Sequence, residues 1–156
     1  MNKEWKRADT DWFRDCRWGV FTHYLVSKEL SVRQWNRRVE SFDVKHLANR
    51  LAAIGAPYYV ITIGQNSGHY CSPNATYDGF VGIRPSKCSR RDLVADLYEA
   101  LESKGIRLLV YLPSGAPDQD DVAKKRLKWK WGFKKGWGTP TTGLRLVEFQ
   151  RRWEAV

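Results

Sequence analysis

The sequence predicts an α/β fold built on a parallel sheet, and three observations support that expectation. Three short runs, at 17–24, 58–63 and 106–112, have the β-branched and aromatic content of buried strands. Two stretches with apolar residues at helical spacing lie between them, each long enough to cross back over a sheet. Polar side chains follow the strands, and the loops at the carboxyl ends of parallel strands open on one side of the sheet.

The first third of the chain contains one expected helix, one strand and one long loop. A short amphipathic helix is expected over 8–16, and the apolar run that follows it suits a buried strand. His23 stands at the carboxyl end of that strand. The stretch 25–42 is expected to be an irregular loop, with a dense polar and aromatic cluster at 34–38. Loops of this length in compact domains are often functional.

Two crossover helices are expected from their caps and their apolar spacing. Asp43 suits an N-cap for a helix over 44–54, and Gly55 suits its end because glycine tolerates positive φ. Ser89 can cap the second helix, which Gly105 terminates.

The central strand leads into the most polar part of the predicted fold. Its apolar run begins at Tyr58 and stops at Gln65 and Asn66, where a long loop over 65–88 begins. This loop is rich in Ser, Asn, Gly and Pro and is longer than a simple connection requires. We therefore expect ligand-binding groups at this point of the chain.

The C-terminal third predicts a basic helix over 120–131, a turn-rich break at 135–143, and a last helix running to Val156. The last helix has no stop signal and only three strands are clear. Because an α/β barrel takes about 250 residues, we expect residues 1–156 to form the N-terminal portion of one larger barrel domain, ending before its fourth strand. A small three- or four-stranded sandwich that ends in a helix is the open alternative.

Composition narrows the classes of function. With 42% hydrophobic and 13% aromatic residues the chain is globular, and its net charge of +10 raises the question of a polyanion partner. Three cysteines at long spacing, with no paired Cys or His, indicate neither a zinc site nor a disulfide framework, so no metal or cofactor is expected. The polar N-terminus and the lack of a long apolar run predict no signal peptide and no membrane span, which as written means a cytoplasmic protein.

Several motifs together resemble the α-L-fucosidases, retaining glycoside hydrolases with a (β/α) barrel. The segment 12–23, WFRDCRWGVFTH, is similar to the family's WFRDAKFGIFIHW opening, whose histidine touches the sugar. Gln34-Trp35 stands where the family has Glu-Trp, and the segment 90–94, RRDLV, resembles its KRDLV. The resemblance runs from about 12 to 113 and implies a partial (β/α)8 TIM barrel of three to four βα units.

One motif departs from the family. Where the family has Lys-His-His-Asp-Gly-Phe after the second strand, this chain has GQNSGH, so Gln65 and Asn66 align with two sugar-contacting histidines. Amides keep the hydrogen-bonding capacity and remove a titratable group. The resemblance implies a nucleophilic aspartate after the fourth strand, beyond Val156, so we assign no catalytic residue and expect this chain alone to be inactive.

The expected site consists of residues at strand ends and in the neighbouring loops. By resemblance, His23 touches the sugar. Trp35 is expected to offer its flat, amphipathic side chain as a wall for a sugar ring, with core packing as its alternative. Tyr111 aligns with a tyrosine pair of the family, with core packing as its alternative. The expected sugar-binding residues are His23, Gln34, Trp35, Gln65, Asn66 and Tyr111.

The expected function is hydrolysis of a terminal α-linked fucose or a related deoxysugar in glycans, and two other functions stay open. One is a non-catalytic carbohydrate-binding relative. The other is a single-stranded nucleic-acid-binding protein, because the tract 124–137 interleaves lysines with tryptophans; without a nucleic-acid motif we do not expect it. An open half-barrel also predicts self-association through its unpaired edge.

Overall fold

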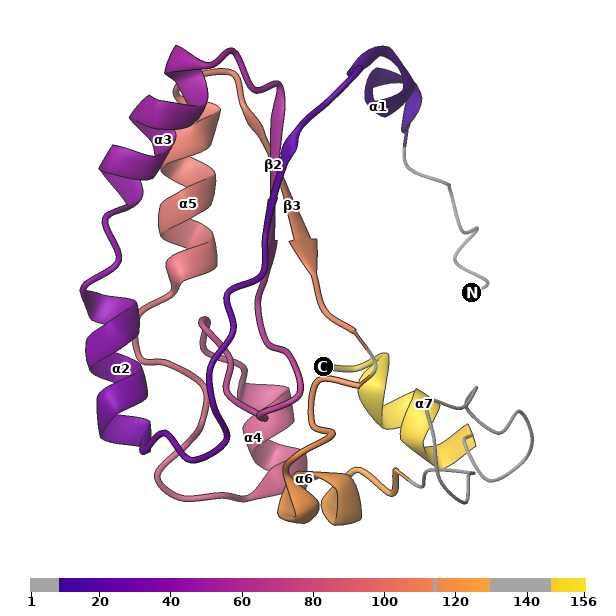
Figure 1. The fold of residues 1–156 in the computed structure, drawn as a ribbon. Helices are drawn as coiled ribbons and strands as arrows, with labels where there is room; N and C mark the ends of the chain where they lie inside the picture. Colours follow the sequence, from indigo (N-terminus) through magenta and orange to yellow (C-terminus); the bar gives the residue numbers. More distant parts are fainter. Residues whose placement is uncertain (1–8, 114, 130–146) are drawn as a thin grey trace.

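The computed structural model describes residues 9–113, 115–129 and 147–156. Three strands form a parallel sheet in the order β1-β2-β3 (Figure 1). Their bounds are β1 Val20–Thr22, β2 Tyr58–Thr62 and β3 Arg107–Tyr111. Phe21 lies opposite Val60, and Val60 lies opposite Leu109. The parallel α/β class predicted from the sequence is confirmed, while closure into a barrel stays a prediction.

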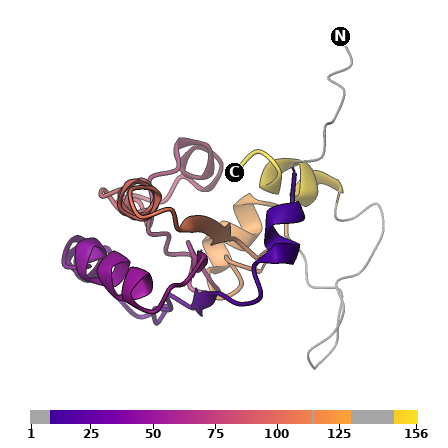
Figure 2. The same ribbon diagram turned by 90° about the horizontal axis from the view of Figure 1, so that it is seen from above.

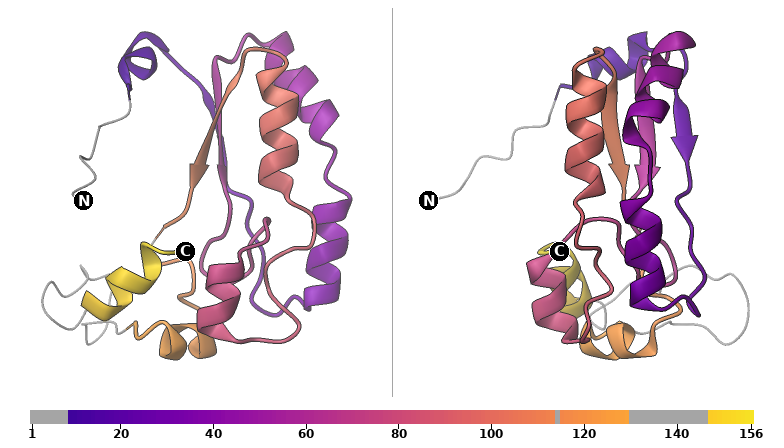
Figure 3. Two further views of the ribbon diagram at one scale, coloured as in Figure 1. Left: turned by 180° about the vertical axis from the view of Figure 1, so that it is seen from behind. Right: turned by 90° about the vertical axis from the view of Figure 1, so that its left-hand side faces the viewer.

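The helices are divided between one face of the sheet and its two ends. Their bounds are α1 Asp11–Asp15, α2 Val32–Glu40, α3 Val44–Ala53, α4 Ala75–Val81, α5 Leu93–Glu102, α6 Asp121–Arg126 and α7 Val147–Trp153. Helices α3 and α5 cover the same face of the sheet (Figures 1 and 2). Helices α4, α6 and α7 gather toward the carboxyl ends of the strands, and α1 lies near the amino ends (Figure 3).

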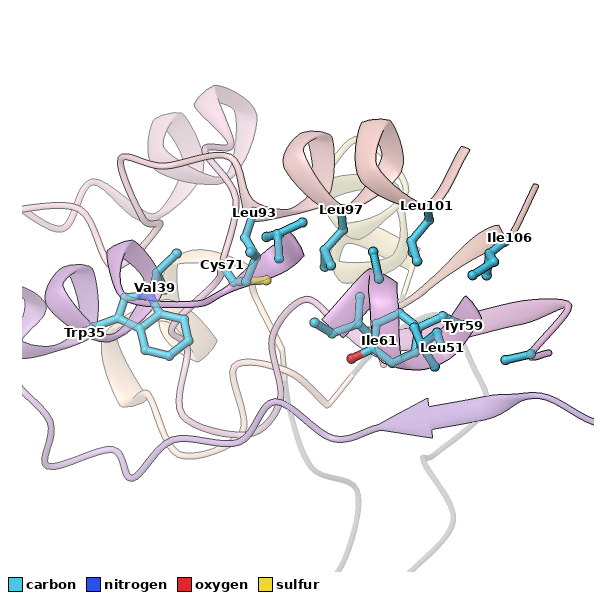
Figure 4. Packing of buried hydrophobic residues seen from close by; sticks show 13 residues of the cluster. Trp35, Val39, Leu51, Tyr59, Ile61, Cys71, Leu93, Leu97, Leu101 and Ile106 are labelled. Atoms are coloured by element: carbon cyan, nitrogen blue, oxygen red, sulfur yellow. The ribbon is translucent and has the colours of Figure 1, made fainter. Parts of the chain in front are cut away.

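The main core lies between the sheet and the helices that cover it. Tyr59 and Ile61 of β2 are fully buried, and Leu93, Leu97 and Leu101 of α5 point toward them (Figure 4). The three leucines are four residues apart, so they form one face of the helix. Burying each of them stabilises the fold by roughly 1.5–3 kcal/mol.

Among the described residues, the opposite face of the sheet is covered at its amino end by α1. Trp12 and Phe13 of α1 place their ring centroids 6.2 and 5.1 Å from that of Tyr58. The guanidinium of Arg107 lies 4.5 Å from the Trp12 ring centroid, a cation–π contact. Toward the carboxyl end of this face Phe21 and Tyr111 are exposed in the part of the chain that the structure describes, and this is where the candidate site lies.

The expectation of an irregular loop over 25–42 is wrong, because α2 occupies its second half. Ser31 and Gln34 form a capping box: the Ser31 hydroxyl accepts from the Gln34 backbone N–H at 3.3 Å, and Gln34 Oε1 accepts from the Ser31 backbone N–H at 3.0 Å. Trp35 and Val39, one turn apart, bury the inner side of the helix. The capping box and this spacing are visible in the sequence and identify the helix.

Three further boundaries differ from the expectation. Helix α4 lies within the predicted loop 65–88, with the Asn74 side chain accepting from the Tyr77 N–H at 2.8 Å. The N-cap of α5 is Asp92, which accepts from the Ala95 N–H at 3.0 Å, and not Ser89. The basic helix is shorter than predicted.

The structure describes only part of the C-terminal third of the chain. Asp120 caps α6, which ends at Arg126 and not at 131. The break predicted at 135–143 lies outside the described residues. Helix α7 confirms the last helix over the part that the structure describes.

The RRDLV segment joins α2 to α5. Nη1 of Arg91 donates to the carbonyl oxygens of Val39, Glu40 and Phe42 at 2.9, 3.0 and 2.9 Å. Nε of Arg91 bonds to Asp96 Oδ2 at 2.5 Å. These carbonyl groups lie at or just after the C-terminal end of α2, where a helix has no N–H donors of its own for them, so Arg91 supplies the donor. Arg91, which belongs to a motif that resembles the α-L-fucosidases, therefore has a structural role in connecting α2 to α5.

Candidate functional site

The candidate site lies at the carboxyl ends of the three strands, where β1 leads to His23, β2 to Gln65 and β3 to Tyr111. Nδ1 of His23 lies 2.8 Å from Oε1 of Gln65. An amide oxygen can only accept, so Nδ1 is the donor in this pair and Nε2 is left to bond another group. The pair joins two residues 42 positions apart and presents an imidazole nitrogen and an amide NH₂ together.

Aromatic rings stand beside this polar pair. Phe21 lies in β1 and His23 directly follows its last residue; two residues apart, they point to the same side of the sheet, and their ring centroids are 4.5 Å apart. Tyr111 approaches from β3, with its centroid 5.7 Å from Phe21 and 6.5 Å from His23. Phe21 and Tyr111 are 48% and 42% exposed, which does not fit the core alternative for Tyr111. Apolar ring faces and hydrogen-bonding groups together suit an amphipathic ligand such as a sugar.

An open hollow of about 350 Å³ adjoins Gln65. Its lining consists of Leu25, Val26, Ser27, Arg38, Gln65, Asn66 and Gln119. Asn66 adopts a left-handed backbone (φ 60°), which asparagine tolerates better than most residues. Its carbonyl oxygen accepts from the Gln119 N–H at 2.6 Å, which fixes the two amide residues side by side. The lining offers amides and one guanidinium, and no carboxylate is among these residues.

The loop that carries Gln65 and Asn66 packs closely on the loop after β3. Gly68 has a φ of +74°, and a Cβ at this position would lie 2.9 Å from Asp120 Oδ2. Its N–H donates to the Ala116 carbonyl at 3.1 Å. Asp120 is held in turn by Lys87 Nζ at 2.5 Å. Only glycine fits this contact, so the loop position depends on it.

Two expected site residues lie elsewhere. Trp35 is 1% exposed, its Nε1–H donates to the Tyr70 carbonyl at 2.9 Å, and its ring packs 5.4 Å from Tyr24 and 5.8 Å from His69. This position agrees with the core alternative and leaves no indole face for a sugar. Gln34 serves the capping box of α2. The structure brings together His23, Gln65 and Tyr111, with Asn66 in the adjoining hollow; their contact with a substrate stays a prediction.

Three residues near the site were not expected. Phe21 could have been found, because the two-residue period of a strand puts it on the same face as His23. Arg38 and Gln119 line the hollow through a helix end and a distant loop. No short-range sequence pattern indicates either of them.

A second histidine is buried beneath the site. His69 is 1% exposed, and neither ring nitrogen has a hydrogen-bond partner of good geometry among the described residues. Burial, helped by the nearby Lys87 ammonium, lowers the pKa of His69 to about 4, while Asp120 and the Leu30 backbone act in the opposite direction. His69 is therefore neutral at pH 7.

Other chemistry is limited in the described part of the chain. Burial raises the pKa of the Cys71 and Cys88 thiols to about 12, so neither is a reactive thiolate at neutral pH. No cluster of three or more His, Cys, Asp or Glu side chains that could hold a metal ion occurs among the described residues. Within the same residues, no helix has the length and apolarity needed to cross a membrane.

Comparison with known proteins gives a structural likeness only. No protein-family profile matches the sequence, and no curated protein matches it. The chain is similar to the crystal structure of a GH29 α-L-fucosidase from Bacteroides thetaiotaomicron, with a TM-score of 0.50 and 22% identity over 80% of this chain. A bacterial fucosidase crystallised with a monovalent iminocyclitol inhibitor gives a TM-score of 0.49 and 20% identity over 80% of this chain. The chain spans 37% of each of these proteins, and at this identity the first likeness shows a shared fold.

Proposed function

We propose that the carboxyl end of the sheet binds a sugar, as part of a glycoside hydrolase of the α-L-fucosidase type. The observation that carries this proposal is the His23–Gln65 hydrogen bond of 2.8 Å beside the exposed rings of Phe21 and Tyr111. Parallel α/β folds bind ligands at this end of the sheet. The fold shared with the B. thetaiotaomicron α-L-fucosidase and the motif resemblance over 12–113 support the same assignment.

In this proposal each group has one task. Nε2 of His23 accepts a hydrogen bond from a sugar hydroxyl, and the amide NH₂ of Gln65 donates to another. Phe21 and Tyr111 cover the apolar face of the ring, to which the methyl group of a deoxysugar such as fucose adds area. Asn66 and Arg38 bind polar groups that extend into the adjoining hollow.

Hydrolysis would belong to a complete barrel. A retaining glycosidase needs two carboxyl groups about 5 Å apart at the scissile bond. No carboxylate is among the described residues that line the hollow or make the ring contacts around His23. The residues of this chain would bind and orient the sugar, and remaining strands of the barrel would supply the carboxylates.

A non-catalytic carbohydrate-binding protein is the second candidate. The observation that favours it is the amide chemistry of the site, because Gln65 and Asn66 cannot exchange protons near neutral pH. Both candidates share the sugar site and differ only in turnover. An assay with a chromogenic α-L-fucoside on the longest natural form of the protein separates them.

The binding experiment compares two histidine variants. L-Fucose is titrated into the protein, into His23→Ala and into His46→Ala, and the heat of binding is measured. His46 is an exposed residue of α3, so its variant is the matched control. We expect His23→Ala to weaken binding about tenfold, a difference of about 1.4 kcal/mol, with no change for His46→Ala. Equal affinities for the two variants would refute the proposed site.

A further inference from the structure

Helices α4, α6 and α7 lie near one another at the carboxyl end of the sheet (Figures 1 and 3). Residues of these helices and of the turn after α6 line a basic groove apart from the sugar site. Its volume is about 740 Å³. It is lined by Phe80, Asp121, Val122, Lys125, Arg126, Lys128 and Arg152. Four of these side chains are cationic and one is anionic. The carboxylate of Asp121 is already paired with Lys124 at 2.8 Å, so the groove has a surplus of positive charge.

The four cations differ in how they are held. Arg152 is fixed: it donates to the Arg126 carbonyl and to Glu148 Oε1, both at 2.6 Å, and its guanidinium lies 5.6 Å from the Phe80 ring centroid. The side chains of Lys125, Arg126 and Lys128 are exposed and have no hydrogen-bond or ion-pair partner within the described ranges. Three cations therefore face solvent around a fixed wall of the groove.

Lys128 has an unusual backbone conformation. Its φ is +63°, two residues after the end of α6. Here the Lys128 N–H bonds to the Lys125 carbonyl at 3.2 Å and the Trp129 N–H bonds to the Lys124 carbonyl at 2.9 Å. Glycine is the preferred residue at this left-handed position after a helix. A lysine here adds charge to the groove at the expense of backbone strain, and such strain is often found at functional positions.

We propose that this groove binds an acidic polysaccharide, one that carries sulfate or carboxylate groups. Charge complementarity favours a polyanion. The nearby rings do not favour a single-stranded nucleic acid, which binds on open aromatic faces. Phe80, which lines the groove, is half-buried and lies beneath the Arg152 guanidinium at 5.6 Å. Phe149 is 6% exposed and stacks with the half-buried Trp129 and Trp153, at centroid distances of 5.8 Å in both cases. This inference does not depend on the sugar site at the strand ends.

The test uses fluorescent dextran sulfate as the probe, with neutral dextran and a single-stranded oligothymidylate of equal charge as comparisons. Anisotropy is followed over a salt series on the full chain. We expect dextran sulfate to bind tightest, with an affinity that falls steeply with salt, and neutral dextran not to bind. The double variant Lys125→Glu/Lys128→Glu should bind dextran sulfate at least about tenfold more weakly.

Two further variants separate the groove from general charge and from misfolding. Lys45→Glu/Lys104→Glu makes the same change of charge at exposed lysines outside the groove, and we expect a change of less than about threefold. Lys128→Gly should weaken binding while the Tm stays equal or rises, since glycine relieves the positive φ. Equal losses in the two double variants would overturn the proposal. If the oligonucleotide binds more tightly than dextran sulfate, the ligand of the groove is a nucleic acid and the polysaccharide proposal is wrong. If dextran sulfate does not bind, the proposed site is refuted.

Discussion

The two faces of the sheet differ in what covers them. On one face Tyr59 and Ile61 are fully buried beneath the leucines of α5. On the other face Phe21 and Tyr111 remain 48% and 42% exposed beside the His23–Gln65 pair. Both faces are rich in aromatic and aliphatic side chains, so hydrophobicity alone does not distinguish them. The difference is the polar pair, which turns an uncovered apolar surface into a candidate binding site.

Truncation of one side chain on each face should affect stability very differently. Leu97→Ala on the covered face should lower the free energy of unfolding by about 3 kcal/mol, because it leaves a cavity in the core. Tyr111→Ala on the open face should lower it by less than about 1 kcal/mol. Urea unfolding measures both. Similar losses would mean that the open face is a structural core.

A second contrast is that between the buried His69 and the exposed His46. Its folded pKa of about 4 lies below the ordinary 6.5, so between these two pH values the unfolded chain binds more protons than the folded one. The free energy of unfolding should therefore fall as the pH is lowered through this window, by up to about 3 kcal/mol. The charged groups that face His69 are Lys87 and Asp120.

Urea unfolding checks this pH dependence of stability. It is measured on the protein and on His69→Phe, at a pH near 7 and at a pH near 4.5. His69→Phe keeps a buried ring without a titrating group, so its unfolding should depend less on pH in this window. His46→Ala is the control for an exposed histidine. An unchanged pH profile in His69→Phe would exclude His69 as the cause.

The joint between α2 and α5 gives a smaller effect. Arg91→Met should lower the free energy of unfolding by about 2 kcal/mol, because three carbonyl oxygens at the end of α2 lose a charged donor. Arg90→Met is the matched control, since Arg90 is exposed and, among the described residues, bonds to Asn36 through its backbone N–H and not through its side chain. Chemical unfolding compares the two. Equal stability of the two variants would show that the Arg91 bonds contribute nothing net.

The smallest expected effect concerns the sheet edges. Within the described residues β1 and β3 each pair with β2 alone, and Val110 of β3 is 51% exposed. We predict concentration-dependent self-association through such an edge, which Val110→Lys should weaken. Ile54→Lys, at the end of α3, is the control for an exposed apolar residue away from the edges. Sedimentation velocity over a series of protein concentrations measures this, and a monomer at every concentration would contradict the prediction.

Much of the fold could be predicted from local sequence patterns. The three strands and helices α3 and α5 follow from apolar runs, apolar spacing and caps such as Asp43. Helix α2 was missed although Ser31 and Gln34 have the spacing of a capping box. The polar and aromatic density of the segment is typical of a loop, while the helical spacing of Trp35 and Val39 favours the helix that the structure shows.

The site could be predicted only in part. That His23 and Gln65 lie close together follows from their positions at strand ends, because the carboxyl ends of parallel strands meet at one edge of the sheet. Tyr111 is expected only from the resemblance to the family's tyrosine pair. The burial of Trp35 depends on its contacts with Tyr24 and His69, which come from other segments. Long-range packing of this kind leaves no local signal in the sequence.

The central claim is that the open face at the strand ends binds a sugar. The most direct measurement is a titration of L-fucose into isotopically labelled protein, following the NMR signals of the aromatic rings and of the side-chain amides. We expect shifts at Phe21, His23, Gln65 and Tyr111 and none at the buried Tyr59. Shifts confined to the helix-covered face or to the basic groove, or no shifts at saturating sugar, would contradict it.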